Sequence, residues 1–342
     1  MASRSKNQNL NRSQKNKLKG ILPFLNLRIL KSIFYTICCF VLFSCENDKV
    51  AQKTYKTENV IVLVIDGPRY SETWGDANHQ YIPNIDSLLT PKGVMYSSFY
   101  NNGVTYTTPG HTSITTGIYQ AIDNYGNELP KNPSFLQQWL KYSKKSANSA
   151  WIVASKDKLE VLANTNDLKW KNSFMPSTNC GINGSGIGSG YRADSLTHIE
   201  VINVMNTYHP NLLFVNYKEP DASGHANNWP NYLNGIKACD EYVRQVWDFI
   251  QNDPVYKDKT TLFITNDHGR HLDGVNDGFI SHGDNCEGCR HIFLYAFGPD
   301  FKQNVIESKP RELIDINATI LEILGLDEQL SDGEVMTELF LN

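Results

Sequence analysis

The stretch Val60-Ile61-Val62-Leu63-Val64-Ile65-Asp66-Gly67 decides the fold class of this 342-residue chain. Its six consecutive apolar residues, most of them β-branched, are typical of a strand that is buried on both faces of a sheet. Further short runs of the same kind follow it at Ala150–Ala154, Leu212–Tyr217, Thr261–Thr265 and Ile292–Phe297. The sequence therefore predicts a sheet whose strands are covered on both sides.

Longer segments with helical periodicity separate these runs. They are Pro133–Tyr142, Asp194–Tyr208, Tyr232–Gln251 and Arg311–Leu324. Strands that alternate with helices predict a three-layer α/β/α sandwich around a mostly parallel sheet. Long linkers are absent, so we expect one domain over residues 58–342. The glycine-rich run Gly181–Gly190 follows no predicted strand and lacks the spacing of a phosphate-binding loop, so it is interpreted as a flexible surface loop.

Composition excludes several classes of protein. The chain is 40% hydrophobic and 20% charged, which is typical of a globular protein and not of a disordered, collagen-like or coiled-coil one. The net charge of −4 is uneven, because residues 1–44 hold eight Lys and Arg and no Asp or Glu. The rest of the chain is therefore strongly acidic, which argues against duplex nucleic acid as a partner.

The basic N-terminus resembles a targeting segment. Lysines and arginines precede the uncharged run Ile33–Ser44, which is short for a transmembrane helix. Leu42-Phe43-Ser44-Cys45 resembles a bacterial lipobox, in which Cys45 would become the lipidated first residue of the mature protein. We therefore expect a lipoprotein signal peptide over residues 1–44, a polar tether over 45–57, and an exported protein anchored to a membrane at the periplasmic face or cell surface. An uncleaved signal anchor is the alternative.

The cysteines give little information about metal binding. Cys286-Glu-Gly-Cys289 is a CxxC pair, but a structural zinc site needs a second ligand pair, and none can be identified in the sequence. A disulfide within a loop or two free thiols is the expectation, and the sequence leaves that choice open.

Acidic and histidine residues follow three of the predicted strands. The strand ends are Asp66-Gly67, Glu219-Pro220-Asp221-Ala222-Ser223-Gly224-His225 and Asn266-Asp267-His268-Gly269, and Ser281-His282-Gly283 precedes the next strand. A single Asp after a strand is more often a turn or capping residue, but three repeats at one sheet edge indicate a ligand site. Carboxylates with imidazoles suit Zn²⁺, or alternatively Mn²⁺ or Fe, and six ligands are enough for two ions.

The stretch Thr107-Thr108-Pro109-Gly110-His111 predicts the start of a helix, with the proline in its first turn. Backbone N–H groups at such a start favour an anion, and a nearby metal would activate a threonine hydroxyl as a nucleophile. Simple helix capping is the alternative interpretation of these threonines.

Taken in order, these motifs resemble the alkaline phosphatase superfamily, and most of all its nucleotide pyrophosphatase/phosphodiesterase branch. The resemblance covers residues 59–342 and rests on VIVLVIDG, IPNIDSLLTPKGVMYSSFY, TTPGHTSITTG, EPDASGH, NDHGR, SHGDN and the terminal DINATIL with Asp332-Gly333. It implies two divalent metal ions, generally zinc, and a threonine nucleophile.

Site roles follow from the resemblance position by position. One metal would be surrounded by Asp66, Thr107, Asp267 and His268, and the other by Asp221, His225 and His282. Thr107 is the implied nucleophile, with Thr105, Thr108 and Thr112 as competitors. Asn127 is the implied phosphate-binding residue, with Asn124 as its alternative, and Arg69 is a further possible substrate contact.

Two features of the sequence bear on which branch of the superfamily the chain resembles. Thr107 replaces the Cys or Ser that sulfatases convert to formylglycine, so sulfatase chemistry is not expected. Lys156-Asp157-Lys158 resembles the K-D-R segment of threonine-dependent phosphatases, which implies that Lys156 binds the substrate phosphate, although two solvated lysines are the alternative. The sequence predicts a two-metal hydrolase of small phosphate esters, a phosphodiesterase or nucleotide pyrophosphatase acting through a covalent phosphothreonine. A phosphomonoesterase and a non-catalytic metal-binding surface lipoprotein are the alternatives, and a mutase would be unusual in an exported protein. The oligomeric state is not predicted.

Overall fold

A mixed sheet forms the centre of the computed structural model, which describes residues 54–326 and 330–341. Its strands lie in the order β4 (Ser177–Cys180), β3 (Ala150–Ala154), β5 (Leu212–Tyr217), β1 (Asn59–Ile65), β6 (Thr260–Thr265), β7 (His291–Phe297), β2 (Val94–Tyr100) and β8 (Val305–Glu307), and β9 (Arg311–Glu312) also pairs with β2. The stretch that begins at Val60 is thus the central strand, with parallel neighbours on both sides.

Strand β7 runs against the rest of the sheet. It pairs antiparallel with both β6 and β2, whereas the other pairings of the described strands are parallel. The beginning of β7 therefore lies at the edge where β1, β5 and β6 end. This reversal brings the segment before β7 to the same edge as the residues that follow the parallel strands.

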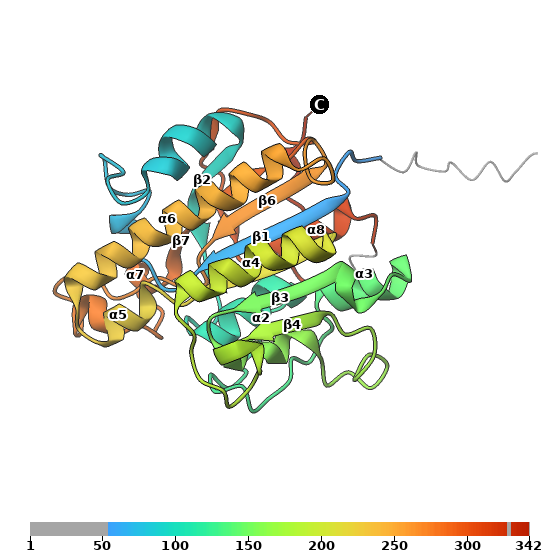
Figure 1. The fold of residues 1–342 in the computed structure, drawn as a ribbon. Coiled ribbons are helices and arrows are strands. Elements are labelled where there is room, and N and C mark those ends of the chain that lie inside the picture. Colours follow the sequence, from blue (N-terminus) through green and yellow to red (C-terminus); the bar gives the residue numbers. More distant parts are fainter. Residues whose placement is uncertain (1–53, 327–329, 342) are drawn as a thin grey trace, which may run out of the picture. The chain divides into compact units, whose positions relative to one another are not determined.

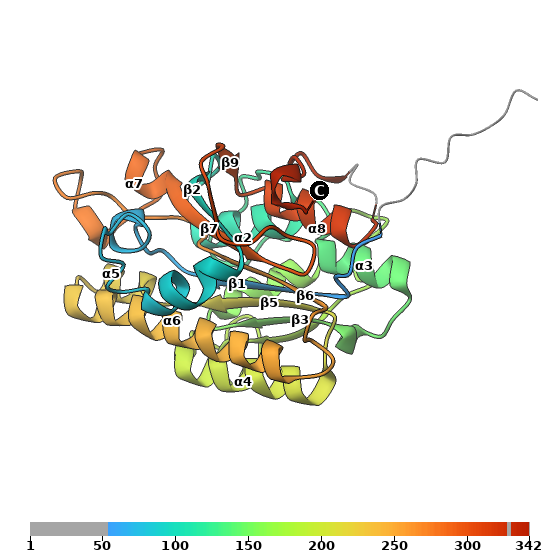
Figure 2. The same cartoon turned by 90° about the horizontal axis from the view of Figure 1, so that it is seen from above.

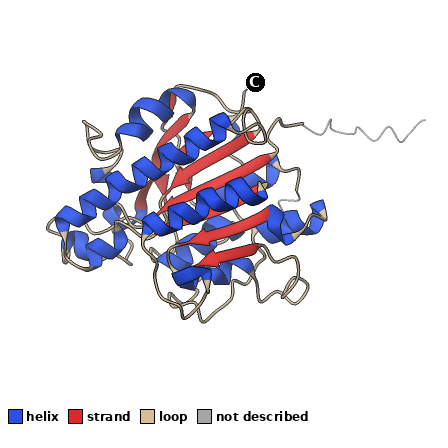
Figure 3. Ribbon diagram, viewed as in Figure 1, coloured by secondary structure: helices blue, strands red, loops and turns tan. Residues whose placement is uncertain are grey.

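Helices cover both faces of the sheet, so the predicted three-layer α/β/α architecture is confirmed. Figures 1 and 2 show α4 (Asp194–Tyr208) and α6 (Trp229–Asn252) on one face, and α2 (Thr107–Thr116), α3 (Phe135–Ser143) and α8 (Asp315–Ile323) on the other. The short helices α5 (Asp221–His225) and α7 (Glu287–Arg290) lie near the edge where β1 ends (Figure 1). Single 3-10 or π turns occupy Tyr70–Glu72, Ile85–Leu89, Thr90–Lys92, Ala147–Ser149, Asp157–Ala163, Ile182–Gly184, Gly278–Ile280 and Thr337–Leu339. Figure 3 distinguishes helices, strands and loops by colour.

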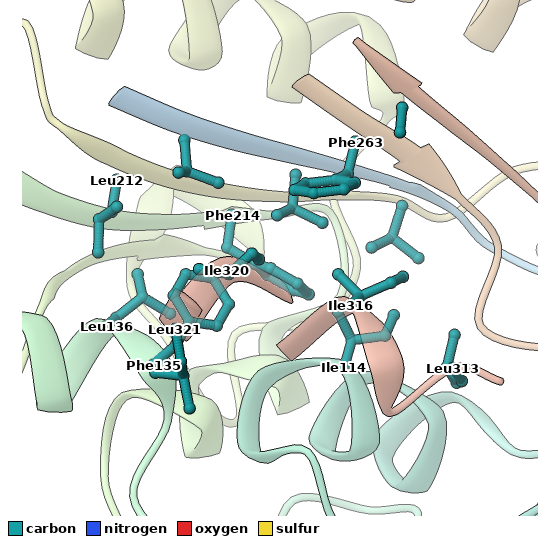
Figure 4. Close-up of a cluster of buried hydrophobic side chains, with 14 of the residues drawn as sticks. Ile114, Phe135, Leu136, Leu212, Phe214, Phe263, Leu313, Ile316, Ile320 and Leu321 are labelled. Carbon is teal, nitrogen blue, oxygen red and sulfur yellow. The ribbon is translucent and has the colours of Figure 1, made fainter. Parts of the chain in front are cut away.

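Successive side chains of β1 lie on opposite faces of the sheet and belong to two hydrophobic cores. Val60, Val62 and Val64 belong to one buried cluster, and Ile61 and Leu63 belong to the other. The first cluster packs β5 and β6 against α2, α3 and α8 (Figure 4). Burial on both faces explains why the strand is an unbroken apolar run.

Some elements differ from the prediction. The predicted helices and strands are present. The ends of β3, β5 and α4 are as predicted and those of the others are shifted, but β2, β4, β8 and β9 were not predicted. Strand β4 directly precedes the glycine-rich run, so the interpretation that no strand precedes this run was wrong. The run is also tied down, because the amides of Gly188 and Gly190 donate to the Asp157 carboxylate at 2.9 and 2.8 Å.

The predicted signal peptide, Cys45 and most of the tether lie outside the described residues. The compact unit of the structure begins at Tyr55. Its first residues are fixed because Asp300 accepts hydrogen bonds from the amides of Lys56 and Thr57 at 2.8 and 3.0 Å. Within residues 54–326 and 330–341, the structure contains no helix with the length and apolar character needed to cross a membrane.

Candidate metal centre and nucleophile

The carboxyl edge of the sheet gathers the predicted ligands. Asp66 follows β1, and Asp267 and His268 follow β6. Helix α5, which begins just after β5, carries Asp221 and His225. His282 comes from the segment before the reversed strand β7. Two groups of possible ligands result, and they divide the six residues as the family resemblance implied.

The first group consists of Asp66, Asp267 and His268, which are fully buried. His268 Nε2 lies 3.5 Å from Asp66 Oδ1 and 3.4 Å from Asp267 Oδ2. Within the described part of the chain, none of these three atoms has a hydrogen-bond partner. Buried polar atoms are almost always satisfied, so three orphaned atoms that face one another fit a cation between them.

The tautomer of His268 supports this fit. Its Nδ1 lies 2.9 Å from the carbonyl oxygen of Gly269, which can only accept, so Nδ1 carries the hydrogen. Burial lowers the pKa of His268 to about 3, so the imidazole is neutral. Nε2 therefore presents a lone pair toward two carboxylate oxygens, as a metal-binding histidine does.

The carboxylates of the first group have opposite pKa shifts. Burial and the neighbouring Asp267 raise the pKa of Asp66 to about 6. Burial also opposes ionisation of Asp267, but the histidines His268 and His111 outweigh it and hold the pKa of Asp267 below its usual value. Asp66 is therefore the carboxylate of this group that is protonated first as the pH falls.

The second group consists of Asp221, His225 and His282. Asp221 Oδ1 lies 3.3 Å from His225 Nε2 and 3.2 Å from His282 Nε2, and the two imidazole nitrogens are 3.0 Å apart. His282 Nδ1 donates to the carbonyl oxygen of Thr105 at 2.8 Å, which directs its Nε2 lone pair toward the group. This arrangement also fits a cation.

Thr107 and Lys156 lie between the two groups. Thr107 is the first residue of α2, and Lys156 Nζ donates to its Oγ1 at 2.9 Å. The same ammonium lies 2.9 Å from Asp66 Oδ2 and 2.6 Å from Asp221 Oδ2. Burial favours the neutral amine, but Asp221 and Asp66 outweigh it, so the pKa of Lys156 stays above its ordinary value. The structure thus joins the predicted nucleophile and one predicted substrate contact, while their roles stay predictions.

Three supporting residues were not predicted. Arg270 is fully buried and donates to Asp221 Oδ1. Asn216, in β5, donates to Asp66 Oδ2 at 3.0 Å and contacts His111 Nε2 at 3.0 Å. His111 Nδ1 in turn lies 3.2 Å from Asp267 Oδ2. The only signal in the sequence was a polar residue inside an apolar strand, together with a histidine one turn after Thr107.

Asn124, and not Asn127, is hydrogen-bonded to the start of α2. The Asn124 Oδ1 accepts from the amide of Thr108 at 2.9 Å and from Lys158 Nζ at 3.0 Å. Asn127 is exposed, and its described hydrogen bond is from its backbone to Asp123. The alternative, Asn124, is thus the asparagine that these bonds connect to α2.

Arg69 and Thr105 have structural partners, whereas the buried hydroxyls of Thr108 and Thr112 have no hydrogen-bond partner among the described residues. Arg69 donates to Glu72 at 2.6 Å and to Asp273 at 2.8 Å, so its guanidinium is paired with carboxylates rather than directed at the two groups. Thr105 Oγ1 donates to the carbonyl of Asp284 at 2.8 Å. Among the candidate threonines, Thr107 is the one with a described contact to Lys156.

A third group of possible ligands joins Cys286 and Cys289 to His271 and Asp284. Both cysteines are free thiols in the structure. The second ligand pair, which could not be identified in the sequence, therefore exists. His271 lies three residues beyond His268, and Asp284 lies two residues beyond His282, so both were hidden beside more obvious ligands.

Residues 47–328 match the family model of the Metalloenzyme superfamily. The chain belongs to the Metalloenzyme superfamily. This match spans both groups of ligands, Thr107 and Lys156. The predicted resemblance to the alkaline phosphatase superfamily is confirmed by the same family model and by structural neighbours.

Individual members of this metalloenzyme superfamily are similar to the chain over different lengths. A phosphopentomutase from Herpetosiphon aurantiacus is 28% identical over 153 residues, which is 44% of this chain and 36% of the relative. The chain thus spans about a third of the length of that relative. A protein in the alkaline phosphatase superfamily from Vibrio parahaemolyticus has a TM-score of 0.60 at 15% identity, covering 85% of this chain and 72% of the other. Murine ectonucleotide pyrophosphatase/phosphodiesterase 5 has a TM-score of 0.57 at 16% identity, covering 83% of this chain and 100% of the other. At this low sequence identity, the two structures show that the fold is shared.

Proposed function

We propose that this metalloenzyme hydrolyses phosphate diesters, as a phosphodiesterase or nucleotide pyrophosphatase, with Thr107 as the nucleophile. The observation that carries the proposal is the 2.9 Å contact of Thr107 Oγ1 with Lys156, between two convergent groups of carboxylates and imidazoles. The murine neighbour supports the choice, because a threonine-to-alanine variant of it is inactive and was solved in complex with AMP.

Two divalent ions, for which zinc is the expectation, would be held by Asp66, Thr107, Asp267 and His268, and by Asp221, His225 and His282. When bound, such ions act as Lewis acids on phosphoryl oxygens and on the oxygens that attack and leave. The orphaned atoms of the first group are the feature of this chain that fits them best.

The residues of the chain then have distinct tasks. Lys156 donates a hydrogen bond to Thr107 Oγ1, which stabilises the alkoxide form of the threonine. Thr107 Oγ attacks phosphorus, the bond to the leaving alcohol breaks, and a phosphothreonine forms that keeps the second ester group of the diester. The threonine gives its proton to water, and the leaving oxygen takes one from water. Water then attacks the phosphorus of this intermediate, which releases the phosphate monoester and restores the hydroxyl.

A pocket near the start of α2 favours a diester. It has a volume of about 540 Å³ and is lined by Val104, Tyr106, Ala121, Ile122, Asp123, Asn124, Tyr125 and Glu128. Tyr106 directly precedes Thr107, and Tyr125 is 80% exposed, so the pocket offers two aromatic side chains to a substrate. Aromatic and apolar linings bind organic groups, which a diester carries on both sides of its phosphorus.

A phosphomonoesterase is the second candidate, because a second lysine lies nearby. Lys158 is buried and donates to the carbonyl of Asn124 at 2.9 Å. Burial and the neighbouring Lys156 lower the pKa of Lys158 to about 8. Two cations close to the nucleophile would favour the additional negative charge of a monoester.

One comparison tests the choice. Full-length protein supplied with Zn²⁺ is assayed on a phosphodiester and a phosphomonoester that share one leaving group. We expect kcat/KM to be at least about tenfold higher for the diester, which corresponds to about 1.4 kcal/mol. A preference for the monoester would replace the first candidate with the second. Activity that survives in Thr107→Ala would overturn both.

The location of the protein is also a proposal. An exported lipoprotein, attached to a membrane through Cys45, would act on phosphate esters outside the cytoplasm. Replacement of Cys45 by Ser should release the protein from the membrane fraction. Continued attachment in that variant would favour an uncleaved anchor instead.

A further inference from the structure

We infer that the loop between β6 and β7 holds a third metal ion, a structural zinc bound by Cys286, Cys289, His271 and Asp284. One potential ligand atom from each of these residues lies within 4.8 Å of the others. Tetrahedral zinc bonds of 2.0 to 2.3 Å place neighbouring ligand atoms about 3.3 to 3.8 Å apart, so the spacing fits one ion. This inference does not rest on the proposed function.

The two thiols are brought together by a helical turn. Cys286 precedes α7 as its N-cap residue, and Cys289 lies within it. The amides of Cys289 and Arg290 donate to the carbonyl of Cys286 at 3.2 and 3.1 Å, which closes the turn. A spacing of three residues on such a turn places both side chains on one side, as in many zinc sites with a CxxC pair.

The surroundings of His271 fix its tautomer. The Ser281 hydroxyl donates to Asp277 Oδ1, so it has no second hydrogen to give to His271 Nδ1. Nδ1 therefore carries hydrogen and faces the Asp277 carboxylate at 3.3 Å. A carboxylate behind a histidine is the usual support of a metal ligand, because it orients the ring and raises the basicity of the other nitrogen.

The opposite nitrogen of His271 faces the proposed ion. Nε2 lies 3.0 Å from Asp284 Oδ2, and two acceptor atoms at this distance need a hydrogen-bond donor or a cation beside them. In the metal-free arrangement the amide of Asn276 serves both atoms, at 3.1 and 3.2 Å. A cation would meet the same need and would also engage the two thiols.

The chemistry of the ligand set selects zinc. Two soft sulfur ligands with one imidazole favour Zn²⁺ over Mg²⁺ or Ca²⁺. Cys289 is fully buried and His271 is 4% exposed, whereas Asp284 is exposed and leaves the ion a path of entry. With four protein ligands, the site would be closed and structural.

Binding of this ion would fix the loop that carries the predicted catalytic ligands. The amide of His271 donates to the carbonyl of Ser281 at 3.2 Å, immediately beside His282. The carbonyl of Cys289 accepts from the amide of Gly269 at 2.8 Å, immediately beside His268. The third ion would therefore hold members of both catalytic groups in place without touching the substrate.

Cobalt provides a test that separates this site from the catalytic one. Full-length reduced protein, stripped of metal, is titrated with Co²⁺, which gives a thiolate-to-cobalt charge-transfer band only where sulfur is a ligand. We expect this band in the unchanged chain, its loss in the double variant Cys286→Ser, Cys289→Ser, and its retention in the matched control Cys180→Ser. Asp221→Asn should keep the band even where catalysis is lost, so failure of the proposed function is distinguishable. A band that survives the double substitution, or that is absent from the unchanged chain, would overturn the inference.

Alkylation of the unchanged chain keeps the test independent of variant folding. With Zn²⁺ added, Cys286 and Cys289 should react with iodoacetamide at least about tenfold more slowly than after chelation, measured peptide by peptide by mass spectrometry. Equal rates with and without zinc would contradict the inference. Cysteines that react only after reduction would show a disulfide and contradict it as well.

Discussion

Lys156 Nζ donates to Thr107 Oγ1 at 2.9 Å while it contacts a carboxylate from each of the two ligand groups. The ammonium therefore connects Thr107 to both ligand groups. Lys156→Met should lower kcat/KM by about ten- to a hundredfold, because hydrogen bonds to charged groups contribute about 1.5 to 3 kcal/mol. We expect the larger loss for a monoester, since it carries more negative charge. Steady-state kinetics on both esters checks this, with the exposed Lys257→Met as control. Equal kinetics in both variants would remove Lys156 from the site.

Thr107→Ala should reduce turnover by at least about a thousandfold, because removal of a covalent nucleophile leaves only binding and electrostatic stabilisation. The metal content of this variant, measured by elemental mass spectrometry, should stay nearly unchanged. Thr112→Ala is the matched control, since Thr112 is equally buried within the same helix α2. A larger loss in the control would transfer the nucleophile assignment to Thr112.

Gly110→Ala should weaken metal binding by the first group. A Cβ at this position would lie 2.9 Å from both the Cβ and the carbonyl oxygen of Asp267. Alanine normally stabilises a helix by up to about 1 kcal/mol relative to glycine, whereas overpacking costs about 1 to 3 kcal/mol. We therefore expect net destabilisation in urea unfolding, together with a raised dissociation constant for zinc. A more stable protein with unchanged zinc affinity would show that Asp267 tolerates the contact.

Metal affinity should fall as the pH falls through about 6, because the pKa of Asp66 is raised to about 6 by burial and by Asp267. Protons then compete with the metal for this carboxylate. In the metal-free protein, the folded pKa lies above the unfolded one, so the contribution of Asp66 to stability is fully present below about pH 4. It is lost as the pH rises through about 6. Zinc titrations and unfolding curves across this pH range check the direction of the change in metal affinity and in stability. Asp66→Asn should abolish the part of each pH dependence that is due to Asp66.

His282→Gln should remove one zinc ion per chain. His282 Nε2 lies 3.2 Å from Asp221 Oδ1, so loss of the imidazole leaves that group with two of its three ligands. Elemental analysis after dialysis gives the stoichiometry. The control is His209→Gln, because His209 at the end of α4 pairs with Asp253 and not with a member of either ligand group. Unchanged zinc content in His282→Gln would contradict the ligand set.

Much of the site could be predicted because its ligands follow strongly apolar strands. A strand buried on both faces is visible as an unbroken apolar run, and the residue at its carboxyl end must lie at one sheet edge. Asp66, Asp221 and Asp267 were found in this way. The short strand β4 was missed because Ser177–Cys180 has no apolar run.

Residues that act through tertiary contacts could not be found by this route. Asn216 lies inside the apolar strand β5, and only the folded sheet shows that it meets Asp66 and His111. His271 and Asp284 are separated along the chain and converge because β7 reverses direction. Asn124 and Asn127 lie only three positions apart, and the family resemblance favoured Asn127, whereas the hydrogen bonds that connect Asn124 to α2 are visible only in the folded chain.

The reversal of β7 has a consequence for how the protein acquires its metals. A single excursion of the chain, from the end of β6 to the start of β7, carries His268, His271, His282 and both cysteines. Metal binding at any point of this segment restricts the conformations of the remaining segment. Most of the conformational entropy of the segment is therefore lost when the first ion binds. Later ions would then bind a loop that is already ordered, and metal loading would be cooperative and sequential rather than independent at each centre.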